Sequence, residues 1–411
     1  MNYFSKQPLI KKLFFLFPLI YISGPFLTDF SILVIDVLFL IYLKNNFDSK
    51  IIHKIKIIFI PLIIFWIVAL INSLLNFNNY EQIIKSLFFV RFIIFSLFVY
   101  YYSHQNFQRI DLVYLKNFTI TSIMIVALSV YIEFFYHYFL EQKINDRYSG
   151  IFFSEEIAGS ILLKLLSFYF LTKFILKSYL DKYDLILIFF ILPLMIIINE
   201  RISFILFLFL IFFLLFFYLK LSLIKKFFVF TLSILVIFLL ISKNEKSLNR
   251  YSQLVSYTYI EAYKKIFNSS PNLPNFLKSE ANQEIVSGYD YFELIYSGIE
   301  VGLTKPLFGV GFRNFRNICP KIKDIKNCNI HPHNYYSEIF AENGIVGLSL
   351  ILLSFYFFIN YMISNSINYG LIIFLINFWP LVTTGSFFNN YIGAFNALII
   401  GSILLKKQIK S

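Results

Sequence analysis

The sequence predicts an all-α, polytopic membrane protein on the basis of three observations. Of its 411 residues, 58% are hydrophobic and 14% are charged, whereas the charged fraction of a soluble domain is nearer a quarter. Apolar runs of about 20 residues, the length that crosses a bilayer as a helix, recur along most of the chain. Segment 243–340 is the exception, because it is richer in polar and turn-forming residues. This composition excludes an ordinary soluble domain.

About twelve membrane-spanning helices are expected. The apolar runs place them at 8–26, 28–43, 54–75, 83–103, 112–136, 157–176, 183–198, 202–220, 225–242, 342–363, 369–384 and 389–405. Some, such as 28–43 and 183–198, are short for a hydrocarbon core of about 30 Å. The spans divide the chain into residues 1–242 with nine helices, an extramembrane segment at 243–340, and residues 341–411 with three helices.

Basic residues in the connecting loops predict the orientation, because Lys and Arg are enriched in cytoplasmic loops. One set of loops carries Lys6, Lys11, Lys12, Lys44, Lys50, Lys54, Lys56, Arg109, Lys116, Lys173, Lys177, Lys182, Lys220, Lys225, Lys226, Lys406, Lys407 and Lys410. The opposite set carries only Lys85, Lys143, Arg147 and Arg201. Both termini are therefore expected in the cytoplasm, with 243–340 on the other side. Anchoring to the lipid bilayer then accounts for much of the net charge of +13, and no nucleic-acid partner is expected.

The extramembrane segment 243–340 is expected to be mostly helical. Tyr and Lys recur at helical spacing in 247–267, and Tyr recurs again in 288–303. The Pro- and Asn-rich stretch 268–283 separates these two runs. We therefore expect two or more amphipathic helices that lie against the membrane.

The two cysteines of the chain, Cys319 and Cys328, both lie in this segment. Outside the cytoplasm a disulfide is allowed, and closing so short a loop contributes about 2–3 kcal/mol in the chain-entropy model. Two unpaired thiols are the alternative. No metal site is expected, because a C-x8-C pair beside H-x-H lacks the usual ligand spacing.

Three short polar motifs close the extramembrane segment and open the next span. They are Pro306-Leu-Phe-Gly-Val-Gly311 followed by Phe315, then His331-Pro-His-Asn334-Tyr335, and then Glu342-Asn-Gly-Ile-Val-Gly347-Leu348. In residue type and spacing they resemble the signature of the bacterial O-antigen ligase and O-antigen polymerase family. Two weaker similarities lie upstream, in Arg147-Tyr-Ser-Gly-Ile-Phe-Phe153 with Ala158-Gly159, and in Glu200-Arg201-Ile-Ser203.

The resemblance implies a bacterial inner-membrane glycosyltransferase with a GT-C-like helical fold and a periplasmic loop at 243–340. The implied donor is a polyprenyl-diphosphate-linked glycan, such as O-antigen. The implied acceptor is lipid A–core for a ligase, or a second lipid-linked repeat unit for a polymerase. Both need the same chemistry, so these residues do not separate them. The rival class is a flippase for lipid-linked oligosaccharides, although the internal repeats typical of transporters are not evident here.

Fixed positive charge is needed to expel a lipid diphosphate, and arginine suits phosphate through its bidentate fork. Arg201 is the principal catalytic candidate, because packing explains an arginine after Ile-Ile-Ile-Asn-Glu poorly. Snorkelling or pairing with Glu200 is the alternative. Further candidates for substrate binding are Arg147, Arg250, Arg313 and Arg316, the last two of which can equally be solvated loop residues. Gly309 and Gly311 permit a tight turn whose amides can approach a phosphate.

His333 is the candidate general base, because imidazole titrates near the operating pH. Asn334 is expected to position this base or the acceptor, and His331 to bind substrate. Pro332 predicts a helix that starts directly after it, with His333 in the first turn and Glu338 one turn on. A histidine that anchors the loop by hydrogen bonds is the alternative role.

Two glycines agree with the family resemblance, and one segment departs from it. Gly344 and Gly347 are expected to end a short helix and to admit close packing at the start of the next span. Ser287-Gly-Tyr-Asp-Tyr291 stands where many members carry an arginine. Arg250 or Arg313 is then expected to take that role, if the chain retains it.

Two basic residues inside the spans, Arg91 and Lys164, are costly unless they are paired or face a cavity. They are candidates to line the route of the lipid diphosphate, and Arg91 can equally lie near the outer interface. The extramembrane acids form no D-x-D pair. We therefore expect a metal-independent displacement without a cofactor, with inversion at the anomeric carbon.

Overall fold

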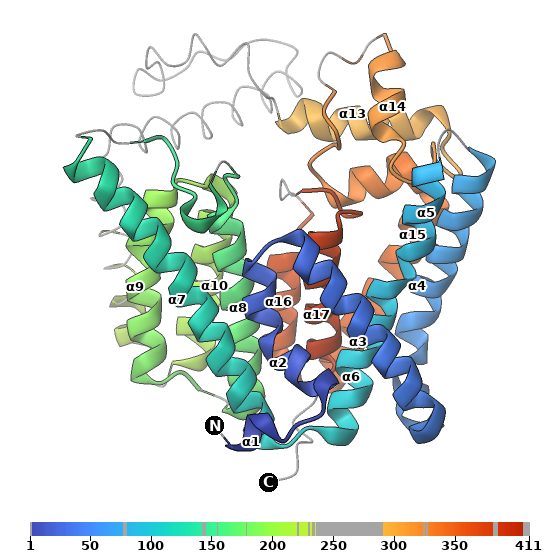
Figure 1. Ribbon diagram of the computed structural model, residues 1–411. Helices are drawn as coiled ribbons and strands as arrows, with labels where there is room; N and C mark the ends of the chain where they lie inside the picture. The colour runs from blue at the N-terminus through green and yellow to red at the C-terminus, as the bar shows by residue number, and fades with distance from the viewer. Residues whose placement is uncertain are drawn as a thin grey trace. The chain divides into compact units, whose positions relative to one another are not determined.

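Every regular element in the described part of the chain is a helix (Figure 1). The computed structural model describes residues 2–76, 80–141, 145–153, 155–177, 179–219, 222–228, 231, 235, 291–323, 325, 328–380 and 385–405. The helices are α1 (Asn2–Ser5), α2 (Leu9–Ile22), α3 (Pro25–Asn46), α4 (Ser49–Leu75), α5 (Tyr80–Phe88), α6 (Val90–Asn106), α7 (Arg109–Phe139), η1 (Gly150–Phe152), α8 (Ala158–Leu176), α9 (Lys182–Ile198), α10 (Arg201–Tyr218), α13 (Tyr291–Thr304), α14 (Phe315–Ile318), η5 (Cys319–Lys321), α15 (Tyr335–Ser364), α16 (Asn368–Asn377) and α17 (Asn390–Ile403).

Seven helical stretches among the described residues are long and apolar enough to cross a membrane. They are α3, α4, α5 together with α6, α7, α8, α10 and α15, and α16 and α17 are shorter apolar helices. The prediction of an all-helical, polytopic membrane protein is confirmed. A helix stands at the position of each expected span except 225–242, which lies largely outside the described residues, as do 236–290.

Polar caps mark where several apolar helices begin. Asp48 accepts a hydrogen bond from the backbone N–H of Lys50 at the start of α4, and Asn389 accepts one from Tyr391 at the start of α17. Asp181 and Asp184 form a reciprocal capping box at the start of α9. Such side chains satisfy backbone N–H groups that have no partner within the helix.

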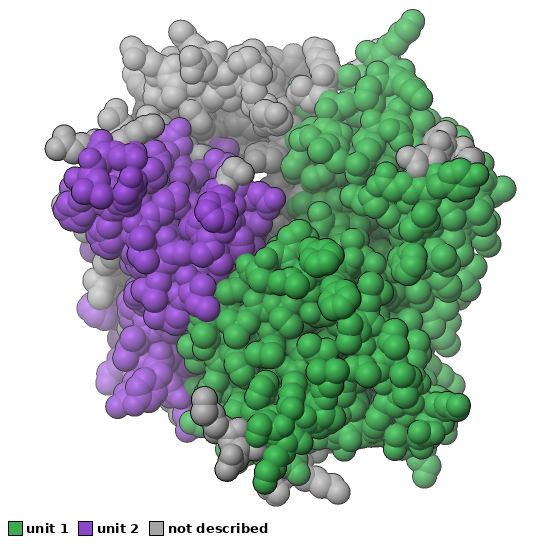
Figure 2. All heavy atoms as spheres, viewed as in Figure 1, with its two compact units in different colours: residues 1–122, 164–178, 290–411 green, residues 123–163, 179–289 purple. Residues whose placement is uncertain are grey.

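The chain divides into two compact units, which Figure 2 colours separately. Unit 1 comprises Met1–Ser122, Lys164–Ser178 and Asp290–Ser411. Within it α4 packs against α15, α6 against α17, α3 against α2 and α6, and α13 against α15. The interior is largely aromatic, with fully buried rings such as those of Phe14, Phe95 and Phe98.

Unit 2 comprises Ile123–Leu163 and Tyr179–Tyr289. Its described part contains the second half of α7, the start of α8, and α9 and α10. The Tyr131 hydroxyl on α7 donates to the Phe190 carbonyl on α9 over 2.9 Å. Asn199, at the turn between α9 and α10, has a left-handed φ of 59° and donates through Nδ2 to the Asp146 carbonyl over 3.0 Å. The first bond ties α7 to α9, and the second ties the loop after α7 to the α9–α10 turn.

Candidate functional site

The first turns of α15 organise the polar end of unit 1. Asn334 caps this helix, since its Oδ1 accepts hydrogen bonds from the N–H groups of Tyr336 and Ser337 at 3.0 and 3.2 Å. Its Nδ2 donates to the Pro380 carbonyl over 2.6 Å. The prediction that Pro332 starts the helix is therefore wrong: the cap selects Tyr335 as the first helical residue. His333 precedes the helix rather than lying in its first turn.

Gly344 interrupts α15 and lets the loop before α14 pass close to it. Its φ of 64° and ψ of −167° belong to a region that is essentially restricted to glycine. An added Cβ would lie 2.3 Å from the Leu307 carbonyl oxygen. The expectation that Gly344 ends a short helix and admits close packing agrees with this geometry, and the neighbour it admits is the 306–308 backbone.

Backbone hydrogen bonds join the 306–311 loop to this break. Val310 N donates to Ala341 O over 2.9 Å, and Gly311 N donates to Glu342 O over 3.0 Å. Gly309 N donates to Lys305 O over 2.7 Å. The amides of Gly309 and Gly311, expected to approach a phosphate, are thus occupied by carbonyls of the chain itself. The Gly311 amide docks the loop on Glu342, and the Gly309 amide closes a turn on Lys305.

The Glu342 carboxylate fixes the backbone after that loop. Glu342 is buried, and its two oxygens accept hydrogen bonds from the backbone N–H groups of Arg313 and Phe315. Arg313 has a left-handed φ of 53°, which is uncommon for a residue with a side chain. Holding Arg313 in this conformation is a clear structural role for Glu342.

The Glu338 carboxylate, one helical turn earlier, receives a different segment. It accepts hydrogen bonds from the Ser386 hydroxyl at 2.5 Å and from the Phe387 N–H at 2.6 Å. Glu338 and Ser386 are both buried. Sequence reasoning did not select the 385–388 segment. The available signal was a Gly385-Ser386 pair just ahead of Asn389 and Asn390 in an otherwise apolar region.

Two amide side chains from other helices support the same site, and sequence reasoning missed both. Asn72 of α4 donates through Nδ2 to the carbonyls of Phe308 and Glu342, at 2.5 and 2.8 Å. Gln82 of α5 donates to the Asn314 side chain over 3.0 Å. Each is a polar residue near the end of an apolar run, which was the only sequence signal.

The two histidines lie side by side just before α15. Their ring centroids are 4.2 Å apart. His333 has a left-handed φ of 53°, and its Nε2 lies 3.0 Å from Nδ2 of Asn329. If the amide donates, Nε2 is the acceptor nitrogen of a neutral imidazole, which is the form that a general base needs.

Arg313 and Arg316 place positive charge beside the two glutamates. The Arg313 side chain is half-buried, and its Nε has no hydrogen-bond partner among the described residues. Burial lowers the pKa of Arg313 from its ordinary value, as does the charge of Arg316, whereas Glu342 and Glu338 oppose the shift. Arg316 is exposed. Two arginines in this proximity form a site suited to an anion.

A disulfide closes the loop between these arginines and the histidines. It joins Cys319 and Cys328. Cys319 is fully buried and packs with Val301, Phe315 and Ala341. The covalent link therefore anchors the loop to α13 and to the first segment of α15.

Unit 2 holds the other arginines expected at the site. Arg147 forms an ion pair with Glu156. Arg201 is the first residue of α10, and the preceding Glu200 accepts a hydrogen bond from the Ser160 hydroxyl over 3.0 Å. Burial raises the pKa of the Glu200 carboxyl, and its contacts with Ser203 and Ser160 and the charge of Arg147 oppose this.

The remaining basic candidates are either paired or outside the described residues. Arg91 Nη2 forms an ion pair with Asp29 over 2.7 Å, and Lys164 Nζ lies 5.8 Å from the centre of the Phe395 ring. Arg250 and 287–290 lie outside the part that the structure describes. Across the described residues, no three His, Cys, Asp or Glu side chains are grouped as a metal site would require.

Apolar helices long enough to cross a membrane, with a dense polar site at the start of one of them, define a polytopic membrane protein with an organised polar end. Residues 186–352 match the family model described as O-antigen ligase. The match extends from α9 into α15 and includes Arg201, Arg313, Arg316, His331 and His333. No curated protein matches the sequence.

Proposed function

We propose that this protein transfers a polyprenyl-diphosphate-linked glycan to a saccharide acceptor at the outer face of the bacterial inner membrane. The proposed acceptor is lipid A–core, as for an O-antigen ligase. Both termini would then lie in the cytoplasm, with 243–340 in the periplasm. The family match to residues 186–352 supports the enzyme class, and the distribution of Lys and Arg in the loops supports the orientation.

The observation that carries the proposal is the convergence of three distant motifs at the first turns of α15. The 306–311 loop docks on Ala341 and Glu342 through backbone bonds. Glu342 holds the backbone of Arg313, and the capped helix start holds the segment with His333 directly before it. A candidate base and a candidate phosphate ligand are therefore both fixed to one helix. That arrangement suits a reaction in which proton removal and departure of a charged group must be coordinated.

His333 is the proposed general base. The acceptor hydroxyl attacks the anomeric carbon, and its proton passes to Nε2 of His333. For this the hydroxyl replaces Asn329 as the group that donates to Nε2. The bond between the anomeric carbon and the diphosphate oxygen breaks in the same step. A single displacement of this kind inverts the anomeric configuration and releases the lipid diphosphate.

Arg313 is the proposed ligand for the departing diphosphate in unit 1, with Arg316 as its neighbour. The Nε of Arg313 is buried and has no hydrogen-bond partner within the described residues, so the proposed phosphate contact is made by the rest of this half-buried guanidinium. Arginine charge would stabilise the leaving group without a metal ion. Arg201 of unit 2 is proposed as a catalytic residue, and Arg147 of unit 2 and His331 of unit 1 are proposed as substrate-binding residues.

Transfer of a labelled glycan in liposomes tests the proposal. The purified protein is reconstituted with lipid-linked oligosaccharide and an added acceptor. We expect transfer by the wild type and a loss of roughly 10²–10⁴-fold in His333→Ala, the range typical for removal of a general base. His53→Ala is the matched control, because His53 is an exposed histidine at the start of α4. A folded His333→Ala variant with full activity would exclude His333 as the base, and flipping of the lipid-linked sugar without transfer would exclude the enzyme.

Arg313→Lys tests the phosphate ligand separately from the base. Lysine keeps the charge but cannot form the planar bidentate contact. We expect a higher KM for the donor, and Arg316→Lys is the comparison variant because Arg316 is exposed. An unchanged donor KM in Arg313→Lys would remove Arg313 from the site.

Deletion of the gene identifies the acceptor. Free polymer together with bare lipid A–core would support the ligase proposal. Single repeat units on the core would instead indicate a polymerase that joins lipid-linked repeat units.

A further inference from the structure

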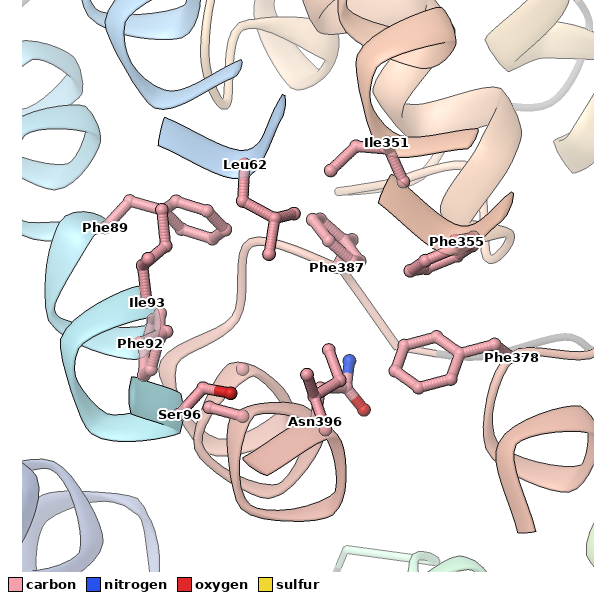
Figure 3. A pocket seen from close by; sticks show the side chains of 13 residues that line it. Leu62, Phe89, Phe92, Ile93, Ser96, Ile351, Phe355, Phe378, Phe387 and Asn396 are labelled. Carbon is pink, nitrogen blue, oxygen red and sulfur yellow. The ribbon is translucent and has the colours of Figure 1, made fainter. Parts of the chain in front are cut away.

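Two features of unit 1 take no direct part in the proposed transfer reaction. One is a cavity of about 50 Å³ between α4, α6, α15 and α17 (Figure 3). Among the described residues that line it, Ser96 and Asn396 alone have polar side chains, so the cavity offers no titratable group to the reaction. The other feature is the Asn329 side chain, which meets the candidate base directly.

The orientation of the Asn329 amide follows from its two hydrogen bonds. Its Oδ1 accepts from the backbone N–H of Ile330 over 2.7 Å. Because a backbone N–H can only donate, the oxygen occupies that side of the amide and the NH₂ occupies the other. Nδ2 lies 3.0 Å from Nε2 of His333. The group that faces His333 is therefore a donor.

A donor at this position decides which imidazole nitrogen carries the proton. An amide NH₂ cannot accept a hydrogen bond, so Nε2 of His333 must be the unprotonated nitrogen. The neutral imidazole then has its proton on Nδ1. A general base that takes a proton at Nε2 needs this tautomer. The Asn329 amide thus selects the reactive form of His333.

Three attachments hold the segment 328–334 in place. Its first residue is bonded to the buried Cys319. In its middle, Pro332 is buried, and a Cβ added at Gly298 of α13 would lie 2.8 Å from the Cβ of this proline. At its end, Asn334 caps α15. The segment is therefore fixed at both ends and in the middle, which preorganises the contact between amide and imidazole.

The same contact can be exchanged for a substrate. Asn329 and His333 are both half-buried, so the contact lies at the surface of the site rather than inside the fold. An acceptor hydroxyl that displaces the amide replaces one donor to Nε2 by another. The net cost of this exchange in hydrogen bonding is small.

We propose, with His333 as the base of the proposed glycan transfer, that Asn329 is a positioning residue for the proton transfer. Its amide keeps Nε2 of His333 unprotonated while the site holds no acceptor, and the acceptor hydroxyl then takes the place of the amide. The proton passes from the hydroxyl to Nε2 as the oxygen attacks the anomeric carbon.

Asn329→Asp separates this role from a structural one. The carboxylate still accepts from the Ile330 N–H and preserves the shape, but its second oxygen is an acceptor that faces Nε2. That oxygen requires a proton on Nε2, so the base is lost. Since the wrong tautomer costs about 10⁴-fold in a serine-protease triad, we expect a loss on the order of 10²–10⁴-fold at neutral pH. The remaining activity should rise only at higher pH than in the wild type, because the carboxylate stabilises the imidazolium.

Lys323→Gln is the matched control. It lowers the charge of the same disulfide loop by one unit from an exposed position, and it should keep the wild-type rate and pH profile. The other ionisable groups on the elements that pack with this segment stay the same in both variants. They are His331, Glu293 and Glu300 of α13, Arg313, Arg316, and Glu338 and Glu342 of α15. A change in the pH profile of Asn329→Asp alone therefore reports on the contact with His333.

Nitrogen-15 NMR of the full-length protein, labelled at histidine and reconstituted without substrate, measures the tautomer directly. The chain has five histidines, and the spectrum of His333→Ala identifies the signals of His333. The wild type should show a proton on Nδ1 and none on Nε2. Asn329→Asp should show a proton on Nε2.

Two results would overturn the proposal. One is a wild-type spectrum with the proton on Nε2, and the other is an Asn329→Asp variant with wild-type transfer and an unchanged pH profile. The spectrum requires no turnover, so it decides the tautomer even if the wild type transfers no glycan. Absence of transfer by the wild type would instead refute the proposed function.

Discussion

Replacing Glu342 by Gln is the sharpest test of how the site is held together. Both oxygens of this buried carboxylate accept hydrogen bonds from backbone N–H groups, those of Arg313 and Phe315. A backbone N–H can only donate. The glutamine side chain has one acceptor oxygen and one donor NH₂, so one of the two N–H groups must face another donor. The variant therefore leaves a buried donor unsatisfied while preserving shape and volume.

The expected magnitude follows from that single unmade bond. An unsatisfied buried polar group costs about 1–3 kcal/mol, which lowers the folding equilibrium constant by roughly 5- to 150-fold. Glu338→Gln is the matched control, because one of its partners is the Ser386 hydroxyl. A hydroxyl can accept as well as donate, so glutamine can donate to Ser386 and still accept from the Phe387 N–H. We expect Glu338→Gln to be the milder change.

The assay is equilibrium unfolding of the purified variants in mixed micelles, followed by circular dichroism as the SDS fraction is raised. Glu342→Gln should have the lower free energy of unfolding. In the liposome assay it should also lower transfer, because the strained backbone of Arg313 loses its anchor. Equal stability of the two variants would refute the assignment of Glu342 as a double acceptor.

Three further substitutions test the remaining supports of the site. Gly344→Ala should lower the unfolding midpoint by more than Gly24→Ala. Both glycines have a positive φ, for which the backbone strain of an alanine costs about 1–3 kcal/mol, but only the Cβ at Gly344 would meet a backbone atom, at 2.3 Å. Equal effects of the two substitutions would contradict the close approach at Gly344. Asn334→Ala should lower the free energy of unfolding of the protein by about 0.5–2 kcal/mol, because α15 loses its N-terminal cap. The same SDS titration measures this change, and an unchanged midpoint would argue against the cap. Cys319→Ser should lower the free energy of unfolding of the protein by about 2–3 kcal/mol in the chain-entropy model. A reductant should cause the same loss in the wild type and have no effect on the variant. A wild type whose stability does not respond to reductant would count against the disulfide.

The membrane class and most helix positions could be predicted from the sequence because hydropathy is a local property. The apolar run expected at 202–220 corresponds to α10 at Arg201–Tyr218, and that at 157–176 corresponds to α8 at Ala158–Leu176. The similarity of residues 186–352 to the O-antigen ligase family could be predicted as well, because the motifs that carry it are short and contiguous. Local rules failed where two of them competed, as at His333: Pro332 favours a helix start, but the Asn334 side chain supplies the hydrogen bonds that decide it.

The partners of the site residues could not be predicted in the same way. The bond between Gln82 and Asn314 joins residues 232 positions apart, and that between Asn72 and the Glu342 carbonyl joins residues 270 apart. Such contacts depend on how each helix is rotated and on the path of the loops between them. The expectation that the Gly309 and Gly311 amides face a phosphate shows this limit, since glycine permits the turn but does not specify which groups its N–H will meet.

By itself, the sequence determined that this chain is a helical membrane protein, that its residues 186–352 resemble the O-antigen ligase family, and where its polar motifs stand along the chain. Only the tertiary structure decided what those motifs contact. It gave Glu342 two backbone donors, assigned Glu338 to the 385–388 segment, and set the Asn329 amide against Nε2 of His333. The reason is physical: burial in a membrane follows from the composition of each segment, whereas hydrogen bonds and charge balance follow from which segments meet.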